Sequence, residues 1–197
     1  FGSHVAIVGG LVPTLLIPDP PGDMGAHVGT ADIDLCLSIH LLEGDTADYY
    51  ASIVDGLSKP GLQHGERNGR TTHWRWVGMF RGVRVVVDLL SPQRQSPGRP
   101  ERPAAGTVAE ENIGQRHDVA TIAGAYGHLG ALDTERIPRR VAAAAGNLAM
   151  DFPVAGLTSW LCLKADGIQQ RDKAKDSFDV VWVLQALGPE QAAEIVK

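Results

Sequence analysis

Residues 31–40 read Ala-Asp-Ile-Asp-Leu-Cys-Leu-Ser-Ile-His, and apolar side chains occupy every second position. A period of two is typical of a half-buried β-strand, whose successive side chains point to opposite faces of the sheet. Asp32 and Asp34 therefore leave the same face, with their carboxylates close together. Two adjacent negative charges repel each other, so the pair predicts a neutralising cation. Magnesium suits this position, because it takes carboxylate and phosphate oxygens as ligands.

The segments around this strand alternate between strand-like and helix-like patterns. Strands are expected at 5–8, 72–79 and 83–90, with a hairpin at 80–82, and helices at 11–17, after Thr46, from 156, from about 172 to 187 and from 190. Residues 92–135 are proline-rich and are expected to form an insertion or linker with some helix, and the pattern at 141–149 does not separate strand from helix. We therefore expect an α/β (α+β) fold, with a small mixed sheet flanked by helices in a core of residues 1–153 and a C-terminal helical region at 154–197.

The composition sets broad limits on what the protein does. The chain has 197 residues, 44% of them hydrophobic, and a net charge of −5, which argues against a strongly basic surface that follows long stretches of nucleic acid. It has no apolar run of about 18 residues, so no membrane span is expected. Cys36 and Cys162 lie in apolar patterns and are expected to be buried, reduced thiols of a cytoplasmic protein. The chain starts at Phe1 without an initiator Met, so we expect a fragment of a longer protein.

A third carboxylate, Asp88, follows the apolar run Val83–Val87. A carboxylate in so apolar a strand needs a partner. A neighbouring strand would direct Asp88 toward the same metal ions as Asp32 and Asp34. The alternative partner is an arginine such as Arg84.

Together, these features resemble the nucleotidyltransferase superfamily, which has the polymerase-beta-like fold. The Gly9-Gly10 turn, the Asp32-x-Asp34 pair and the later Asp88 match the turn, the paired acids and the third acid of that superfamily. The 21 residues between Gly10 and Asp32 exceed the spacing of its compact members.

A second block narrows the resemblance. Lys164 is followed by Arg171-x-Lys-x-Lys-Asp-x-x-Asp179, which is similar to the signature of AbiEii-type toxins. These are the toxin halves of type IV toxin–antitoxin pairs, and they include the MenT-type enzymes that modify tRNA. The resemblance covers roughly residues 4–90 and 154–187.

The resemblance implies a nucleotidyltransferase that transfers a nucleoside monophosphate from an NTP, such as ATP, to an acceptor hydroxyl. It implies two Mg²⁺ ions (Mn²⁺ as a substitute), the NTP as co-substrate, a tRNA acceptor and a cognate antitoxin as partners, and a helical region that completes the NTP site. The residues assigned to metal binding are Asp32, Asp34 and Asp88; those assigned to the nucleotide are Gly9, Gly10, Thr30, Lys164 and Arg171; those assigned to catalysis are Asp32, Asp34, Asp88, Lys164 and Asp179.

Taken together with the Asp32-x-Asp34 pair, the spacing of the second block supports phosphate handling. Lys164 and Arg171 are seven residues apart and share one face of a continuous helix, where they would meet the β- and γ-phosphates. The alternative is that residues 171–179 form a solvated, charged helix start with local ion pairs.

Two other functions remain open. A small-molecule nucleotidyltransferase acting on an antibiotic-like hydroxyl would suit the net charge of −5. A catalytically silent protein of the same fold would bind a nucleotide or a protein partner. Trp74 and Trp76, which alternate onto one face, are expected to pack in the core rather than to stack on bases.

Overall fold

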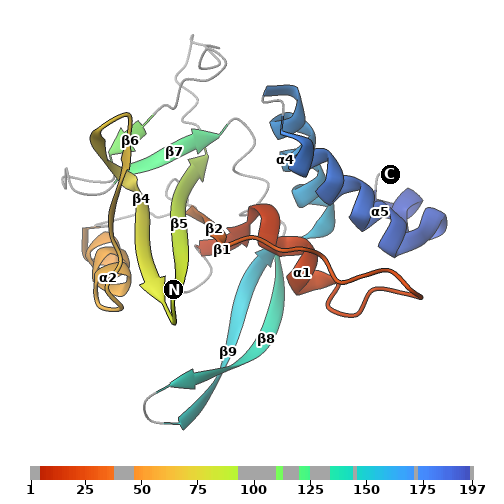
Figure 1. Ribbon diagram of the computed structural model, residues 1–197, viewed down its shortest axis with the longest axis horizontal. Helices are drawn as coiled ribbons and strands as arrows, with labels where there is room; N and C mark the ends of the chain where they lie inside the picture. The colour runs from red at the N-terminus through yellow and green to blue at the C-terminus, as the bar shows by residue number, and fades with distance from the viewer. Residues whose placement is uncertain are drawn as a thin grey trace.

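The computed structural model describes residues 5–37, 47–92, 110–112, 120–124, 134–143, 146–170 and 173–195 (Figure 1). The described strands are β1 (Val5–Val8), β2 (Asp32–Leu37), β3 (Gln63–Arg67), β4 (Arg70–Phe80), β5 (Val83–Pro92), β6 (Glu110–Asn112), β7 (Ala120–Gly124), β8 (Thr134–Ala143) and β9 (Gly146–Ala155). The described helices are the 3₁₀ turn η1 (Gly9–Leu11), α1 (Val12–Leu16), α2 (Ala47–Ser58), α4 (Leu157–Gln170) and α5 (Ala174–Ile195).

The strands of the described part form one nine-stranded mixed sheet. Its main path runs β3-β4-β5-β2-β1-β9-β8, and β7, which carries β6, pairs with the end of β5. β2 and β5 are parallel to each other, whereas β1 is antiparallel to β2 and parallel to β9. The predicted fold class, a mixed α/β fold with a C-terminal helical part, is confirmed.

Helices cover both faces of this sheet, as the alternation in its strands requires. On one face, α2 packs over buried side chains of β2, β4 and β5, among them Leu37, Trp76 and Leu89. On the other face, α1, α4 and α5 enclose a second cluster that includes Cys36 of β2 and Trp160 of α4 (Figure 1). Asp32 and Asp34 alternate onto this second face, so they share it with the C-terminal helices.

Most of the expected elements appear within the described residues. β2 begins at Asp32, and the hairpin between β4 and β5 turns at Arg81 and Gly82, whose φ angles are both positive. Gly188 has a non-helical conformation and interrupts α5 before Pro189, as the sequence predicts. Trp74 and Trp76 are buried, which confirms their packing role.

Other parts of the chain differ from expectation. Within the stretch 141–149, left open between strand and helix, residues 141–143 belong to β8 and residues 146–149 to β9, an antiparallel pair that extends away from the rest of the fold (Figure 1). The described parts of 92–135 are strands rather than helix. β3 was not expected, because its sequence is polar; it forms by pairing with β4 across a tight turn at Asn68-Gly69, whose positive φ angles suit a two-residue hairpin loop.

Two further expectations concern the burial of the two cysteines and the absence of a membrane-spanning segment. Cys36 is buried, and burial raises its pKa to about 12, but Cys162 is exposed on α4, so the expectation of two buried thiols is wrong for Cys162. Its position explains the error, because Cys162 faces outward from a helix whose opposite side packs on the sheet. Among the described helices, none is both long and apolar enough to cross a bilayer.

Candidate active site

Three charged residues form a row across the middle of the sheet. Asp34 of β2 is paired with Asp88 of β5, and Asp88 is paired in turn with Arg75 of β4. On its other side Asp34 is paired with Val8, the residue before the Gly9-Gly10 turn. Residues directly opposite each other on neighbouring strands share a face of the sheet. The two predicted metal-binding acids Asp34 and Asp88 are therefore neighbours, and Asp32 lies two residues before Asp34 on the same face.

Gly9 is pressed against the carboxylate of Asp34. A Cβ placed on Gly9 would lie 1.9 Å from Oδ2 of Asp34, a distance too short for any side chain at this position. Gly9 also has a positive φ of 73°. The indole Nε1 of the fully buried Trp160 donates a hydrogen bond of 2.8 Å to the carbonyl oxygen of Gly9. The turn thus needs glycine both for its conformation and for its closeness to Asp34, and α4 holds it in place.

Asp88 is held by Arg75 rather than by Arg84. Nε and Nη2 of Arg75 donate hydrogen bonds of 2.7 and 2.6 Å to Oδ1 and Oδ2 of Asp88, and only 7% of Asp88 is exposed. The hydrogen bond with Asp88 raises the pKa of Arg75 most strongly, and the charges of Asp88, Asp32 and Asp34 raise it further. Arg84, the alternative partner suggested by the sequence, is exposed, because its position lies near the hairpin end of β5, opposite Met79.

The acids fit a divalent cation in kind, because carboxylate oxygens on adjacent strands are the ligands that magnesium takes. Within the described part of the chain, no three acidic, histidine or cysteine side chains are placed closely enough to hold an ion, and both oxygens of Asp88 accept hydrogen bonds from Arg75. Asp32, Asp34 and Asp88 are therefore suitable for a divalent cation in chemical type, but they do not form a three-ligand site, and Arg75 pairs with Asp88.

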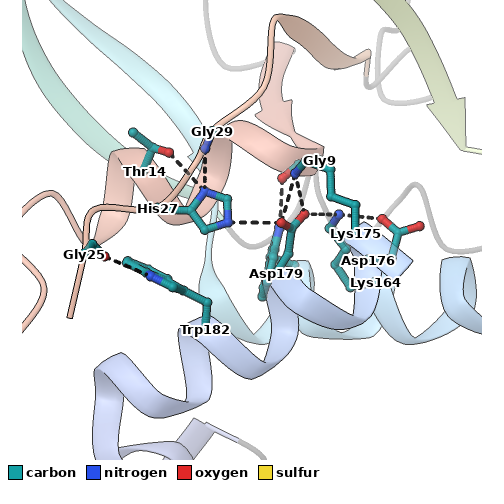
Figure 2. A network of polar contacts seen from close by, with 11 residues as sticks. Gly9, Thr14, Gly25, His27, Gly29, Lys164, Lys175, Asp176, Asp179 and Trp182 are labelled. Carbon is teal, nitrogen blue, oxygen red and sulfur yellow. Dashed lines mark hydrogen bonds and ion pairs between the residues drawn. The ribbon is translucent and has the colours of Figure 1, made fainter. Parts of the chain in front are cut away.

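A second charged cluster lies where α4 and α5 meet (Figure 2). Nζ of Lys164 donates hydrogen bonds of 2.7 Å to Oδ1 of Asp176 and to Oδ2 of Asp179. Asp179 is completely buried, and Asp176 and Lys164 are 3% and 6% exposed. Burial raises the pKa of Asp179, but the hydrogen bonds and charges of Lys164 and Lys175 outweigh it, so the pKa of Asp179 is lowered. The solvated-helix interpretation of residues 171–179 is therefore wrong for Asp176 and Asp179.

Lys175 connects this cluster to the glycine turn. Its Nζ lies 2.9 Å from both carboxylate oxygens of Asp179, and its side chain is 43% exposed. A Cβ placed on Gly10 would lie 3.2 Å from this Nζ and 3.1 Å from the methyl group of Thr30. Thr30 also accepts a hydrogen bond from the amide of Asp32 through Oγ1, which fixes the start of β2. Gly10 thus lies between Thr30 and Lys175, one residue away from the Asp34 contact.

His27 joins the loop before β2 to the same cluster. Its Nδ1 accepts a hydrogen bond of 3.0 Å from the amide of Gly29, so Nδ1 carries no proton, and Nε2 carries the proton that points to Oδ1 of Asp179 at 3.0 Å. Burial, together with the charges of Lys175 and Lys164, lowers the pKa of His27 more than Asp179 raises it, in agreement with this neutral form. The indole of Trp182 supports the loop from below by donating a hydrogen bond to the carbonyl oxygen of Gly25 (Figure 2).

The structure thus brings the predicted residues together in two groups on either side of the Gly9-Gly10 turn. Asp32, Asp34 and Asp88 lie toward Gly9, whereas Thr30 lies at Gly10 and Lys164 and Asp179 lie behind Lys175. Arg171, predicted to bind phosphate, lies outside the described residues. The assignment of these residues to a nucleotide and to metal ions stays a prediction.

Sequence reasoning missed four contributors to this site, namely His27, Arg75, Trp160 and Lys175. Lys175 carried a usable signal, because it stands four residues before Asp179, at the spacing of an ion pair on a helix. His27 carried none, because it lies in an irregular loop and meets a partner 152 residues away.

We expect Gly9→Ala to destabilise the protein and to displace the Asp34 carboxylate. Gly82→Ala is a matched control, since Gly82 also has a positive φ, of 79°, but no atom lies within 4 Å of its Cβ position. Both variants should lose about 1–2 kcal/mol for the left-handed backbone, and Gly9→Ala should lose more because of the collision with Asp34. Urea denaturation of the two variants measures the difference, and equal losses would show that the contact with Asp34 is unimportant.

The neutral state of His27 predicts a pH dependence. The pKa of His27 is lowered from 6.5 in the folded protein, so the unfolded chain binds the proton first as the pH falls. Stability supplied by His27 is complete above about pH 6.5 and is lost below it, by at most about 1.4 kcal/mol per pH unit. In His27→Gln, whose amide donates to Asp179 without ionising, the melting temperature should decline less between pH 7.5 and 5. Parallel declines in the two proteins would contradict a neutral His27.

Comparisons of the chain with models of known families, with curated proteins and with solved structures found no match. Any assignment of function therefore rests on the fold, the row of acids, the buried cluster and the resemblance of the sequence motifs.

Proposed function

We propose that the protein is a magnesium-dependent nucleotidyltransferase that transfers a nucleoside monophosphate from an NTP to an acceptor hydroxyl and releases pyrophosphate. One observation carries the proposal: Asp34, which is paired with Asp88, lies against Gly9, and the Nζ of Lys175, whose side chain is 43% exposed, lies against the adjacent Gly10. A carboxylate that would bind a cation and a lysine that would donate to phosphate oxygens thus lie next to each other along the Gly9-Gly10 backbone, which carries no side chains. A polyphosphate that carries its own metal ion needs both.

The residues that would hold the metal ions are Asp32, Asp34 and Asp88. Bound magnesium would neutralise charge on the phosphate oxygens and lower the pKa of the acceptor hydroxyl. Asp88 would coordinate a metal ion only if Arg75 moved away from it, or through oxygen lone pairs that Arg75 does not use. Asp34, which is only partly buried, and Asp32, which is exposed, are the more accessible ligands.

The remaining chemistry is positioning. The acceptor oxygen would form a bond to the α-phosphorus, the bond between that phosphorus and the oxygen that bridges to the β-phosphate would break, and pyrophosphate would leave. The proton of the acceptor hydroxyl would pass to a carboxylate of the acid set. The Gly9-Gly10 backbone would allow the phosphates to approach closely, because neither residue carries a side chain. Such alignment, with charges fixed in advance, supplies most of the rate in phosphoryl transfer.

For the acceptor, we propose tRNA or another macromolecule, on the strength of the similarity of the 164–179 block to tRNA-modifying toxins. A cognate antitoxin is proposed as a partner on the same ground. The net charge of −5 favours the second candidate, a small polycationic acceptor of the antibiotic type. A transfer assay that offers both acceptors distinguishes them.

Asp34→Asn should reduce nucleotide transfer at least about 100-fold, because it removes one charge from the metal ligands without changing the size of the side chain. The assay incubates the protein with each α-³²P-labelled NTP, Mg²⁺ and either total tRNA or an aminoglycoside. Asp151→Asn, the same change at an exposed position of β9, should retain full activity. Undiminished transfer by Asp34→Asn would exclude this site. If the wild-type protein neither binds Mg-NTP nor labels any acceptor, the alternative of a catalytically silent protein would hold instead.

Arg75→Met should tighten the binding of Mn²⁺, since the guanidinium group occupies Asp88 and repels a cation near Asp32 and Asp34. Calorimetric titration with Mn²⁺ measures the affinity without requiring turnover. Arg84→Met is the matched control, because Arg84 lies on the same strand as Asp88 but is exposed. Affinity that is unchanged or weaker in Arg75→Met would show that Arg75 does not compete with the metal for Asp88.

A further inference from the structure

Two lysines belong to the cluster between α4 and α5, and they differ in what they can reach. The side chain of Lys164 is 8% exposed, whereas that of Lys175 is 43% exposed. Lys164 directs its ammonium group inward, between Asp176 and Asp179, at 2.7 Å from each. A ligand would reach Lys164 only if α4 and α5 separated, but it would reach Lys175 from solvent.

The surroundings of Lys175 complete a place for an anion. Its Nζ lies over Gly10, where a Cβ would be only 3.2 Å away, and Thr30 borders the same glycine. The carboxylate of Asp34 lies over the adjacent Gly9. A ligand that crosses the turn would therefore meet the ammonium group of Lys175 at Gly10 and the carboxylate of Asp34, a proposed metal ligand, at Gly9.

Contacts within the protein fix the position of Lys175. Asp179 accepts hydrogen bonds from Lys175 through both of its oxygens, and Asp179 is itself held by Lys164 and His27 (Figure 2). A lysine side chain that is already ordered loses less conformational entropy when it binds a ligand. Lys164 and His27 thus act on Lys175 through Asp179.

We propose that Lys175 binds the terminal phosphates of the NTP, and that Lys164 and His27 are positioning residues that hold Asp179 and, through it, Lys175. This proposal rests on the proposed function and deepens it. It assigns the phosphate contact to Lys175 instead of Lys164, the lysine that helical spacing and the family resemblance favour. It also assigns a role to the buried cluster, which would orient the ammonium group of Lys175 at the glycine turn.

Binding experiments with Lys175→Met and Lys173→Met test the proposal. Lys173 is exposed, lies two residues before Lys175 and provides the same loss of charge. Calorimetric titration uses inorganic triphosphate, ATP and AMP as probes, each with Mg²⁺. Lys175→Met should bind triphosphate and ATP about 10- to 100-fold more weakly, whereas its affinity for AMP should stay within about twofold of wild type, and Lys173→Met should match wild type for all three. Lys175→Arg should restore most of the lost affinity, because it returns a cationic donor.

Lys164→Met separates the two lysine roles. It should lower the melting temperature markedly, since it removes the buried ammonium group that bridges the carboxylates of Asp176 and Asp179, whereas Lys175→Met should melt within a few degrees of wild type. Wild-type affinity for triphosphate in Lys175→Met, or an equal loss of AMP binding, would overturn the assignment of Lys175 to the terminal phosphates. Failure of the wild-type protein to bind any of the probes would be a different result, because it would overturn the proposed function itself and this assignment with it.

Discussion

The buried carboxylate of Asp179 is the constraint on which the C-terminal half of the site depends. It is completely removed from solvent, and an ionised group in that position is strongly unfavourable unless charges and hydrogen bonds compensate. Its partners come from three segments: His27 from the loop before β2, Lys164 from α4 and Lys175 from α5 itself. Satisfying one carboxylate therefore fixes the loop and both helices relative to one another. Because Lys175 is one of these partners, the same interaction places a cation at Gly10.

A second constraint acts on the sheet. Two carboxylates directly opposite each other on neighbouring strands repel, and Arg75 offsets this by pairing with Asp88. The Gly9-Gly10 turn lies between this row and the Asp179 cluster, so charges of both signs face a stretch of backbone that has no side chains. Fixed charges around a narrow polar site are the arrangement that stabilises phosphate chemistry, since little reorganisation is needed when the substrate binds. The stability of the fold and the proposed chemistry thus draw on the same ion pairs.

Much of the acid row was predictable from local sequence. The period of two in residues 31–40 placed Asp32 and Asp34 on one face, and the apolar run before Asp88 indicated a buried strand. The parallel pairing that puts Asp34 beside Asp88 was not predictable from local sequence, because parallel strands are joined by long connections that leave no local signal. β3 escaped prediction for a related reason. Its polar sequence has no preference for a buried sheet face, and pairing with β4 makes it a strand.

The sequence by itself determined the types of element, the alternation that puts the acids opposite the α2 side of the sheet, and the identity of most charged residues near the glycine turn. Only the tertiary structure decided how those charges are used. Spacing along a helix relates Lys164 to Arg171 and Lys175 to Asp179, but it does not say which lysine is buried between two carboxylates and which remains in contact with solvent. The same holds for Arg75 and His27, whose partners lie 13 and 152 residues away. Burial and pairing of charges depend on contacts between distant segments, and those contacts exist only once the chain has folded.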